Sequence, residues 1–190
     1  MRRCSLIFAG AVITISLTSC GRTKEKAYDV STIVLKENES IHEYIVEAFD
    51  ETVYDKEELK SLIQSEIDVS GGQVSLDGFS VEDDVARVSL SYGSSKDYEQ
   101  FNREIFYVGT FGDAVLEGYE FSLQLYSVKD GSEVSVLKLP GMQDEKICIW
   151  ESGHELKIDG NILFFSEGIE LINDHCAAIR EGTYGYVIYE

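Results

Sequence analysis

Residues 17–20, Leu-Thr-Ser-Cys, are the stretch of this chain whose residue types point most directly to a chemical event. A cysteine sulfur is nucleophilic and can be alkylated. Here Cys20 ends an uncharged run, residues 5–19, that follows Arg2 and Arg3. A positive start followed by an apolar run of about 7–15 residues is typical of a cleaved export signal, and such a run is shorter than the ~20 residues that a membrane-spanning helix needs.

These residues resemble the signal of bacterial lipoproteins, and the resemblance covers residues 1–20. It implies cleavage before Cys20 and a diacylglyceryl thioether on its sulfur. Two or three acyl chains hold a protein durably, because each buried methylene contributes about 0.8 kcal/mol of membrane affinity. We therefore expect a signal peptide over residues 1–19, a lipid anchor at Cys20 and a location outside the cytoplasm. The alternative is an ordinary secretory signal, cut nearby, in which Cys20 is incidental.

The charge of the chain separates a basic tether from a strongly acidic body. Residues 20–28 contain three basic residues and one acidic residue, so they form a short linker that could lie against anionic lipid. Residues 29–190 contain 11 Lys and Arg against 34 Asp and Glu, a net charge of −23. This balance argues against a nucleic-acid partner, permits a basic partner or divalent cations, and also serves solubility.

Other residues that could carry chemistry do not form a recognisable site. The three histidines, His42, His154 and His175, are far apart and none belongs to a metal-binding motif. Ser135 and Lys138 have the spacing of acyl-transferring serine enzymes, but a strand places them on opposite faces. Acidic clusters at 55–58 and 82–84 fit a helix cap and a turn better than a calcium site. We predict no catalytic residue, no metal ligand and no cofactor.

Two cysteines remain in the body, Cys148 and Cys176. A disulfide is chemically allowed outside the cytoplasm. Cys148 nevertheless lies in an apolar run, and a buried free cysteine behaves as a small hydrophobic residue. The sequence leaves the pairing open.

The first part of the body predicts a hairpin followed by a helix. Residues 30–36 and 41–48 are β-rich and flank a short polar loop. From residue 55 to residue 67 the apolar positions recur at helical spacing, with Asp55 as N-cap and Gly71 beyond the end. The stripe expected to be buried consists of Leu59, Leu62, Ile63 and Ile67.

The middle of the chain alternates strands and short helices. We expect strands over residues 73–82, 85–92 and 105–108, and short helices over 96–102 and 110–118. Gly78 shifts the phase of its strand, which indicates a bulge. Tyr98 and Phe101 should face inward, and Asp83-Asp84 should form the turn between the first two strands.

From residue 119 onward the chain is almost entirely β-rich. The expected strands are 119–125, 134–137, 146–151, 155–158, 161–166, 169–172 and 184–189. Asp130-Gly131 and Asp159-Gly160 indicate tight turns, the second as a hairpin. Tyr184, Tyr186 and Tyr189 belong to a terminal strand that packs into a sheet, although tyrosines could also stack on sugars. The sum predicts a single α+β domain over residues 29–190, with a largely antiparallel sheet, one main helix and one or two short ones.

The body also resembles a group of uncharacterised lipoproteins of Gram-positive anaerobes. The similar segments are residues 30–33 (Val-Ser-Thr-Ile), 57–60 (Glu-Glu-Leu-Lys), 98–102 (Tyr to Asn) and the β-rich tail. The resemblance supports the location and fold, and it supplies no site residues. The resulting hypothesis is a non-catalytic lipoprotein that binds a protein or another envelope component. The alternative is a small-ligand or glycan-binding lipoprotein associated with transport.

Overall fold

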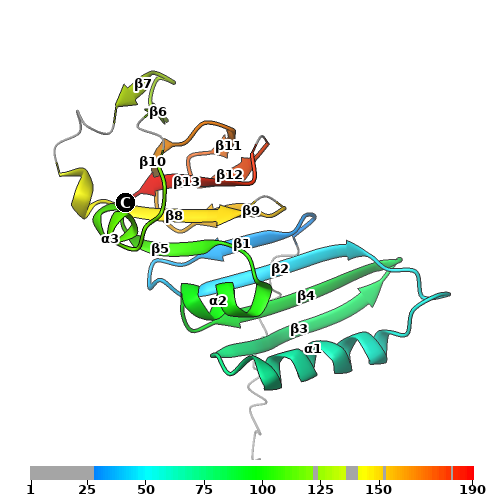
Figure 1. The fold of residues 1–190 in the computed structure, drawn as a ribbon. Coiled ribbons are helices and arrows are strands. Elements are labelled where there is room, and N and C mark those ends of the chain that lie inside the picture. The colour runs from blue at the N-terminus through cyan, green and yellow to red at the C-terminus, as the bar shows by residue number, and fades with distance from the viewer. Residues whose placement is uncertain (1–27, 122–123, 136–140, 152, 181) are drawn as a thin grey trace, which may run out of the picture.

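The strands of this protein form two sheets, as shown by a computed structural model that describes residues 28–190 except 122–123, 136–140, 152 and 181 (Figure 1). Residues 1–27 lie outside the described residues, so the anchor at Cys20 stays a prediction. The two sheets are called sheet A and sheet B below.

Sheet A has seven strands, and the N-terminal hairpin lies at its centre. Its spatial order is β11 (Ile169–Asn173), β12 (Cys176–Ile179), β9 (Glu155–Ile158), β1 (Thr32–Leu35), β2 (Ile41–Ala48), β4 (Val85–Tyr92) and β3 (Val74–Glu82). Neighbouring strands are antiparallel except β1 and β9, which pair in parallel. The bulge predicted at Gly78 is present, because the β3–β4 register shifts between Leu76 and Gly78.

Sheet B has six strands and is antiparallel throughout. Its order is β5 (Phe106–Thr110), β8 (Lys146–Glu151), β13 (Tyr184–Tyr189), β10 (Ile162–Phe165), β6 (Gln124–Ser127) and β7 (Glu133–Ser135). The helices are α1 (Lys56–Ser70), α2 (Ser95–Asn102) and α3 (Phe111–Leu116), with a 3₁₀ turn η2 (Met142–Asp144). The predicted α+β class with a β-rich C-terminal half is confirmed.

Each α-helix begins at a side chain that accepts hydrogen bonds from its first turn. Asp55 accepts from the backbone of Glu57 and Glu58 at the start of α1. Ser94 and Thr110 cap α2 and α3 in the same way. α1 ends at Gly71, whose φ of 71° is left-handed and therefore suits glycine. These caps explain why the helix boundaries could be predicted closely from the sequence.

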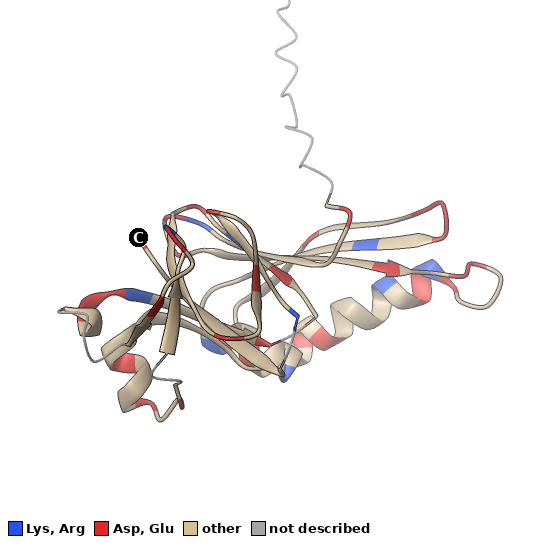
Figure 2. Ribbon diagram, turned by 90° about the horizontal axis from the view of Figure 1, so that it is seen from above, with Lys and Arg blue, Asp and Glu red and all other residues tan. Residues whose placement is uncertain are grey.

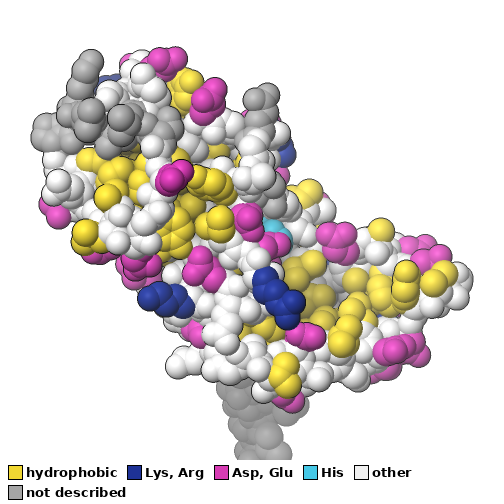
Figure 3. Space-filling view, in the orientation of Figure 1, with side chains coloured by type: hydrophobic (Ala, Val, Ile, Leu, Met, Phe, Trp, Pro, Cys, Tyr) yellow, Lys and Arg dark blue, Asp and Glu magenta, His cyan; other side chains and the backbone are white. Residues whose placement is uncertain are grey.

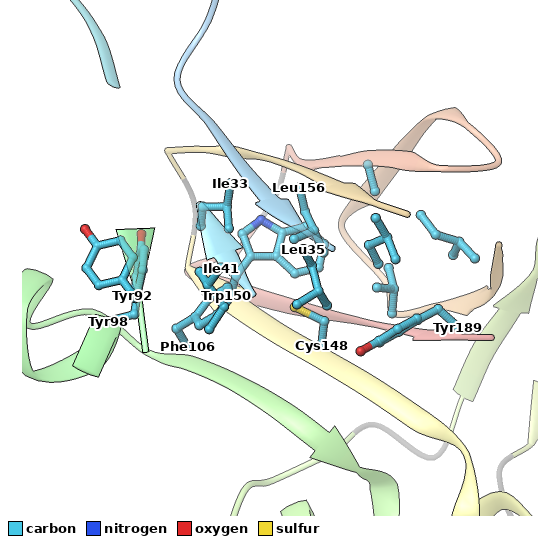
Figure 4. Packing of buried hydrophobic residues seen from close by; sticks show 14 of the residues in the cluster. Ile33, Leu35, Ile41, Tyr92, Tyr98, Phe106, Cys148, Trp150, Leu156 and Tyr189 are labelled. Carbon is cyan, nitrogen blue, oxygen red and sulfur yellow. The ribbon is translucent and has the colours of Figure 1, made fainter. Parts of the chain in front are cut away.

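The main core lies between the two sheets. Figure 4 shows Trp150 and Cys148 of β8 packed against Ile33 and Leu35 of β1. A second core covers the other side of sheet B, where α3 packs against β5 and β8. It includes Phe111, Ala114, Ile147, Ile149 and Ile188. Sheet B is therefore covered on both faces. The tyrosine-rich terminal strand was predicted to pack into a sheet, and it does so as β13, between β8 and β10.

The predicted buried stripe of α1 is only partly correct, because Leu59, Ile63 and Ile67 are half-buried and Leu62 is exposed. α1 packs on β3, the edge strand of sheet A, and touches α2. Ile63 and Ile67 pack against the core, whereas Leu62 is 57% exposed. A helix that lies on a single edge strand buries a narrow strip, so an apolar residue beside that strip faces solvent.

The predicted hairpin at Asp159-Gly160 is also wrong. The strands on either side, β9 and β10, belong to different sheets, so this turn carries the chain from sheet A to sheet B. β12 was not predicted. The strand expected over 119–125 is reduced to β6, which begins at Gln124, while residues 122–123 are not described. Cys148 and Cys176 are both free and buried.

Alanine substitutions at two adjacent positions of α1 test this helix orientation. Ile63→Ala should lower the free energy of unfolding by about 1–2 kcal/mol, less than at a fully buried site, because the side chain is half-buried. Leu62→Ala should change it by less than about 0.5 kcal/mol, because little contact is lost. Urea unfolding of both variants measures the difference. Equal losses at the two positions would contradict the orientation of α1.

Candidate functional site

The strongest gathering of chemistry-bearing side chains surrounds Glu43, a carboxylate in the core. Side chains alternate along β2, so Glu43 shares its face with Ile41 and Ile45. Ile41 belongs to the main core and Ile45 packs against it. Glu43 itself is only 1% exposed. A buried carboxylate is costly unless hydrogen bonds satisfy it, so its partners explain its presence.

Four side chains donate to the Glu43 carboxylate. Tyr92 of β4 donates a short hydrogen bond to Oε2, and the Tyr98 hydroxyl of α2 donates to Oε1 at 3.1 Å. Asn102 Nδ2, at the end of α2, lies 3.4 Å from Oε2 and 3.1 Å from the Tyr92 hydroxyl. His154 Nε2 lies 3.2 Å from Oε1. We call these five residues the Glu43 network.

His154 reaches this network from the segment between β8 and β9. Because an ionised carboxylate only accepts, the hydrogen on Nε2 is assigned from its contact with Glu43. His154 Nδ1 is buried and has no hydrogen-bond partner among the described residues. The backbone of His154 is fixed as well, since Trp150 Nε1 donates to its carbonyl oxygen at 3.2 Å. The side chain of His154 is therefore held at Nε2 and its backbone at the carbonyl oxygen.

The charges around His154 favour its protonated form. Burial lowers the pKa of His154, but the hydrogen bond and charge of Glu43, aided by Glu104 and Glu47, outweigh burial and raise it overall. The pKa of Glu104 is raised, mainly by burial and further by the charges of Glu43 and Glu151, against the lowering effect of His154. Both groups thus bind a proton more readily in the folded protein.

Two further carboxylates hold the segment that leads from α2 into sheet B. Glu151 Oε2 accepts from the backbone nitrogen of Ile105 at 2.9 Å. Glu99 Oε1 accepts from the backbone nitrogen of Phe106 at 3.3 Å and from the Tyr119 hydroxyl at 3.1 Å. The Glu43 network is therefore continued by carboxylates that fix the crossing between the sheets.

The arrangement suits a role in holding the fold together better than a role as a reaction centre. Both Glu43 oxygens are occupied and the side chain is 2% exposed, so little of it could reach a substrate. Glu104 is half-buried, so its carboxylate can exchange a proton with solvent. The chemistry that the geometry supports is proton uptake by a buried histidine and carboxylate.

The other sequence candidates lie elsewhere. His42 Nδ1 is 3.7 Å from Asp77, and His175 Nδ1 contacts the carbonyl of Gly160. Asp55 caps α1, and Asp83-Asp84 form the turn between β3 and β4 with positive φ. Ser135 lies on β7, while Lys138 is outside the described residues. Where the structure describes the chain, no three His, Cys, Asp or Glu side chains lie close enough to hold a metal ion.

Sequence reasoning missed the Glu43 network, although one signal was available. Ile41 and Ile45 lie two residues before and after Glu43, so Glu43 occupies a position of its strand that faces the same way as two apolar residues. A carboxylate in that phase needs buried donors, and tyrosines are suited to provide them. No local pattern, however, indicates that His154 is one of the donors.

Comparison with protein-family models, with curated proteins and with solved structures gives no match for this chain. Among the described helices, none has the length and apolar character required to cross a membrane.

Removal of the central carboxylate should destabilise the protein strongly. Glu43→Ala leaves two tyrosine hydroxyls and His154 without their acceptor, so the free energy of unfolding should fall by about 3–5 kcal/mol. The control is Glu82→Ala at the exposed end of β3, where a change below about 0.5 kcal/mol is expected. Chemical denaturation measures both. A loss below about 1 kcal/mol at Glu43 would contradict the importance of the network.

The network should also make stability depend on pH. The folded-state pKa of His154 is raised above its ordinary value of 6.5, so its contribution is fully present below pH 6.5 and is lost as pH rises through the folded value. The pKa of Glu104 is also raised, so its contribution to stability is likewise lost as the pH rises, starting from a lower pH than that of His154. The free energy of unfolding should therefore fall as the pH rises above 6.5, and this fall should be smaller in His154→Gln. Identical slopes in the two proteins would exclude the role of His154.

Proposed function

We propose that this protein is a membrane-anchored, extracytoplasmic lipoprotein that binds a protein partner and is not an enzyme. The anchor is supported by the resemblance of residues 1–20 to lipoprotein signals. The binding role is supported by the outer side of α1. Because the body is strongly acidic, we expect the partner to be basic.

The outer side of α1 is the observation that carries the binding role. Leu62 and Val69 are 57% and 76% exposed, and they lie seven residues apart, hence on the same side of the helix. Val53 and Tyr54, just before the helix, are exposed as well. Figure 3 shows hydrophobic side chains over α1 and the strands beside it. Grouped exposed apolar side chains of this kind are typical of interaction surfaces.

Acidic side chains flank this apolar group. Glu58 and Glu66 lie four residues before and after Leu62, so they border Leu62 and Val69 on the helix surface. Acidic residues also outnumber basic ones over the rest of the molecule (Figure 2). A surface with apolar residues at its centre and carboxylates at its border suits a partner with an apolar patch and basic surroundings.

Crosslinking on intact cells tests the binding surface. Replacement of Leu62 and Val69 by serine should remove the crosslinked adducts of the protein without lowering its melting temperature, because both side chains are exposed. The matched control replaces Val115 and Leu116, the exposed residues of α3, by serine and should leave the adducts unchanged. Adducts that survive the α1 substitutions would contradict this surface.

Loss of the acylated sulfur tests the anchor separately. Cys20→Ala should release the protein into the medium or leave it unprocessed, because no acyl chain can be attached. Cys4→Ala, in the same signal segment, should change neither processing nor retention. Cell fractionation and mass spectrometry of the N-terminus measure both effects. Unchanged membrane retention of Cys20→Ala would overturn the anchor.

A further inference from the structure

A small pocket lies on the face of sheet A that points away from the core. Its volume is about 230 Å³, and its lining includes Tyr28, Tyr44, Gly78, Arg87 and Ser89. Tyr44 alternates with the buried Glu43 along β2, and Arg87 and Ser89 alternate with the core residues of β4. This pocket is therefore separated by the sheet from the Glu43 network and from α1.

Two tyrosines form the aromatic part of this pocket. The rings of Tyr28 and Tyr44 have centroids 4.5 Å apart and are tilted by 36°. Lys157 Nζ lies 5.9 Å from the centroid of the Tyr28 ring, so the face of sheet A that carries the pocket has a cation, Lys157, in addition to Arg87. Aromatic faces of this kind bind other rings and apolar groups.

The bulge in β3 places a glycine, which has no side chain, in the lining of the pocket. After the register shift, Gly78 pairs with Ser89, and a Cβ atom at position 78 would lie 2.6 Å from Ser89 Oγ. A glycine therefore fits this position without displacing the serine. The hydroxyls of Ser80 and Ser89 add two polar groups to the lining.

Arg87 gives the pocket a charge opposite to that of the body. Among the described residues, none that lines the pocket is acidic, although residues 29–190 carry a net charge of −23. Arg87 has no ion pair within 4 Å among the described residues, whereas Lys36, Lys146 and Arg180 each have an acidic partner. Asp77 on the same face is engaged by Ser91 and His42. A guanidinium available beside aromatic rings is suited to an anion.

We propose that this pocket binds a small aromatic or apolar molecule that carries one anionic group. The ring packs against Tyr28 and Tyr44, and the carboxylate or phosphate accepts hydrogen bonds from Arg87. The volume fits this size: an apolar cavity of about 150 Å³ holds benzene, whereas drug-sized ligands occupy roughly 300–1,000 Å³. A molecule with one aromatic ring and a short charged substituent has a size between these two limits, and it therefore fits the pocket.

The test compares an anion with its neutral analogue. The purified protein, held in phosphatidylcholine nanodiscs, is titrated with 3-phenylpropionate and with 3-phenylpropanol, and binding is followed by ligand-detected NMR. The anion should bind about tenfold more tightly or better, because the alcohol cannot form a charge-assisted pair with Arg87. Arg87→Gln should remove this preference, and Tyr44→Leu should weaken both ligands.

The control is Arg103→Gln, the same change of charge at the end of α2, which should leave the preference intact. Equal affinity of the unmodified protein for the two ligands, a preference that survives Arg87→Gln, or absence of binding would each overturn the proposal. The measurement needs no protein partner, and protein that does not associate with the nanodiscs can be titrated free in the same buffer, so its outcome is independent of the function proposed above.

Discussion

The buried carboxylate of Glu43 is the constraint on which the rest of the fold depends. It lies in a strand of sheet A, and its donors come from β4, from α2 and from the segment between β8 and β9. A buried charge is tolerated only while its partners remain in place, because removing one of them leaves the others unpaired. The network therefore specifies how α2 and the β8–β9 segment sit on sheet A more strictly than apolar packing alone does.

The chain order explains why such a constraint is useful. The β8–β9 segment carries the chain from sheet B back to sheet A, and the segment after α2 carries it from sheet A to sheet B. His154 lies in the first crossing, and Glu99 and Glu151 hold the second. Apolar contacts between sheets tolerate sliding, whereas hydrogen bonds have narrow distances and angles. Polar contacts at these two crossings, which are among several in the described chain, thus constrain the relative position of the sheets.

The features that the sequence predicted are those with local causes. The caps at Asp55, Ser94 and Thr110, the bulge at Gly78 and the N-terminal hairpin each follow from residues close together in the chain. The errors concern which strand lies beside which. Asp159-Gly160 has the composition of a hairpin turn, but β9 pairs instead with β1 in parallel and with β12. Strand pairing between distant segments leaves no local pattern.

The same distinction applies to the candidate sites. The inward phase of Glu43 could be recognised from alternation, while its pairing with His154 depends on two sheets that the sequence alone does not place together. The pocket at Tyr28 and Arg87 likewise combines residues of three strands, β2, β3 and β4, with Tyr28, which precedes the first strand. Sheet A thus separates two environments: acids converge on its core-facing side, and on the other lies the guanidinium of Arg87, which forms no ion pair with the described residues. A cationic partner and an anionic ligand would therefore be directed to different faces, and binding of one need not exclude the other.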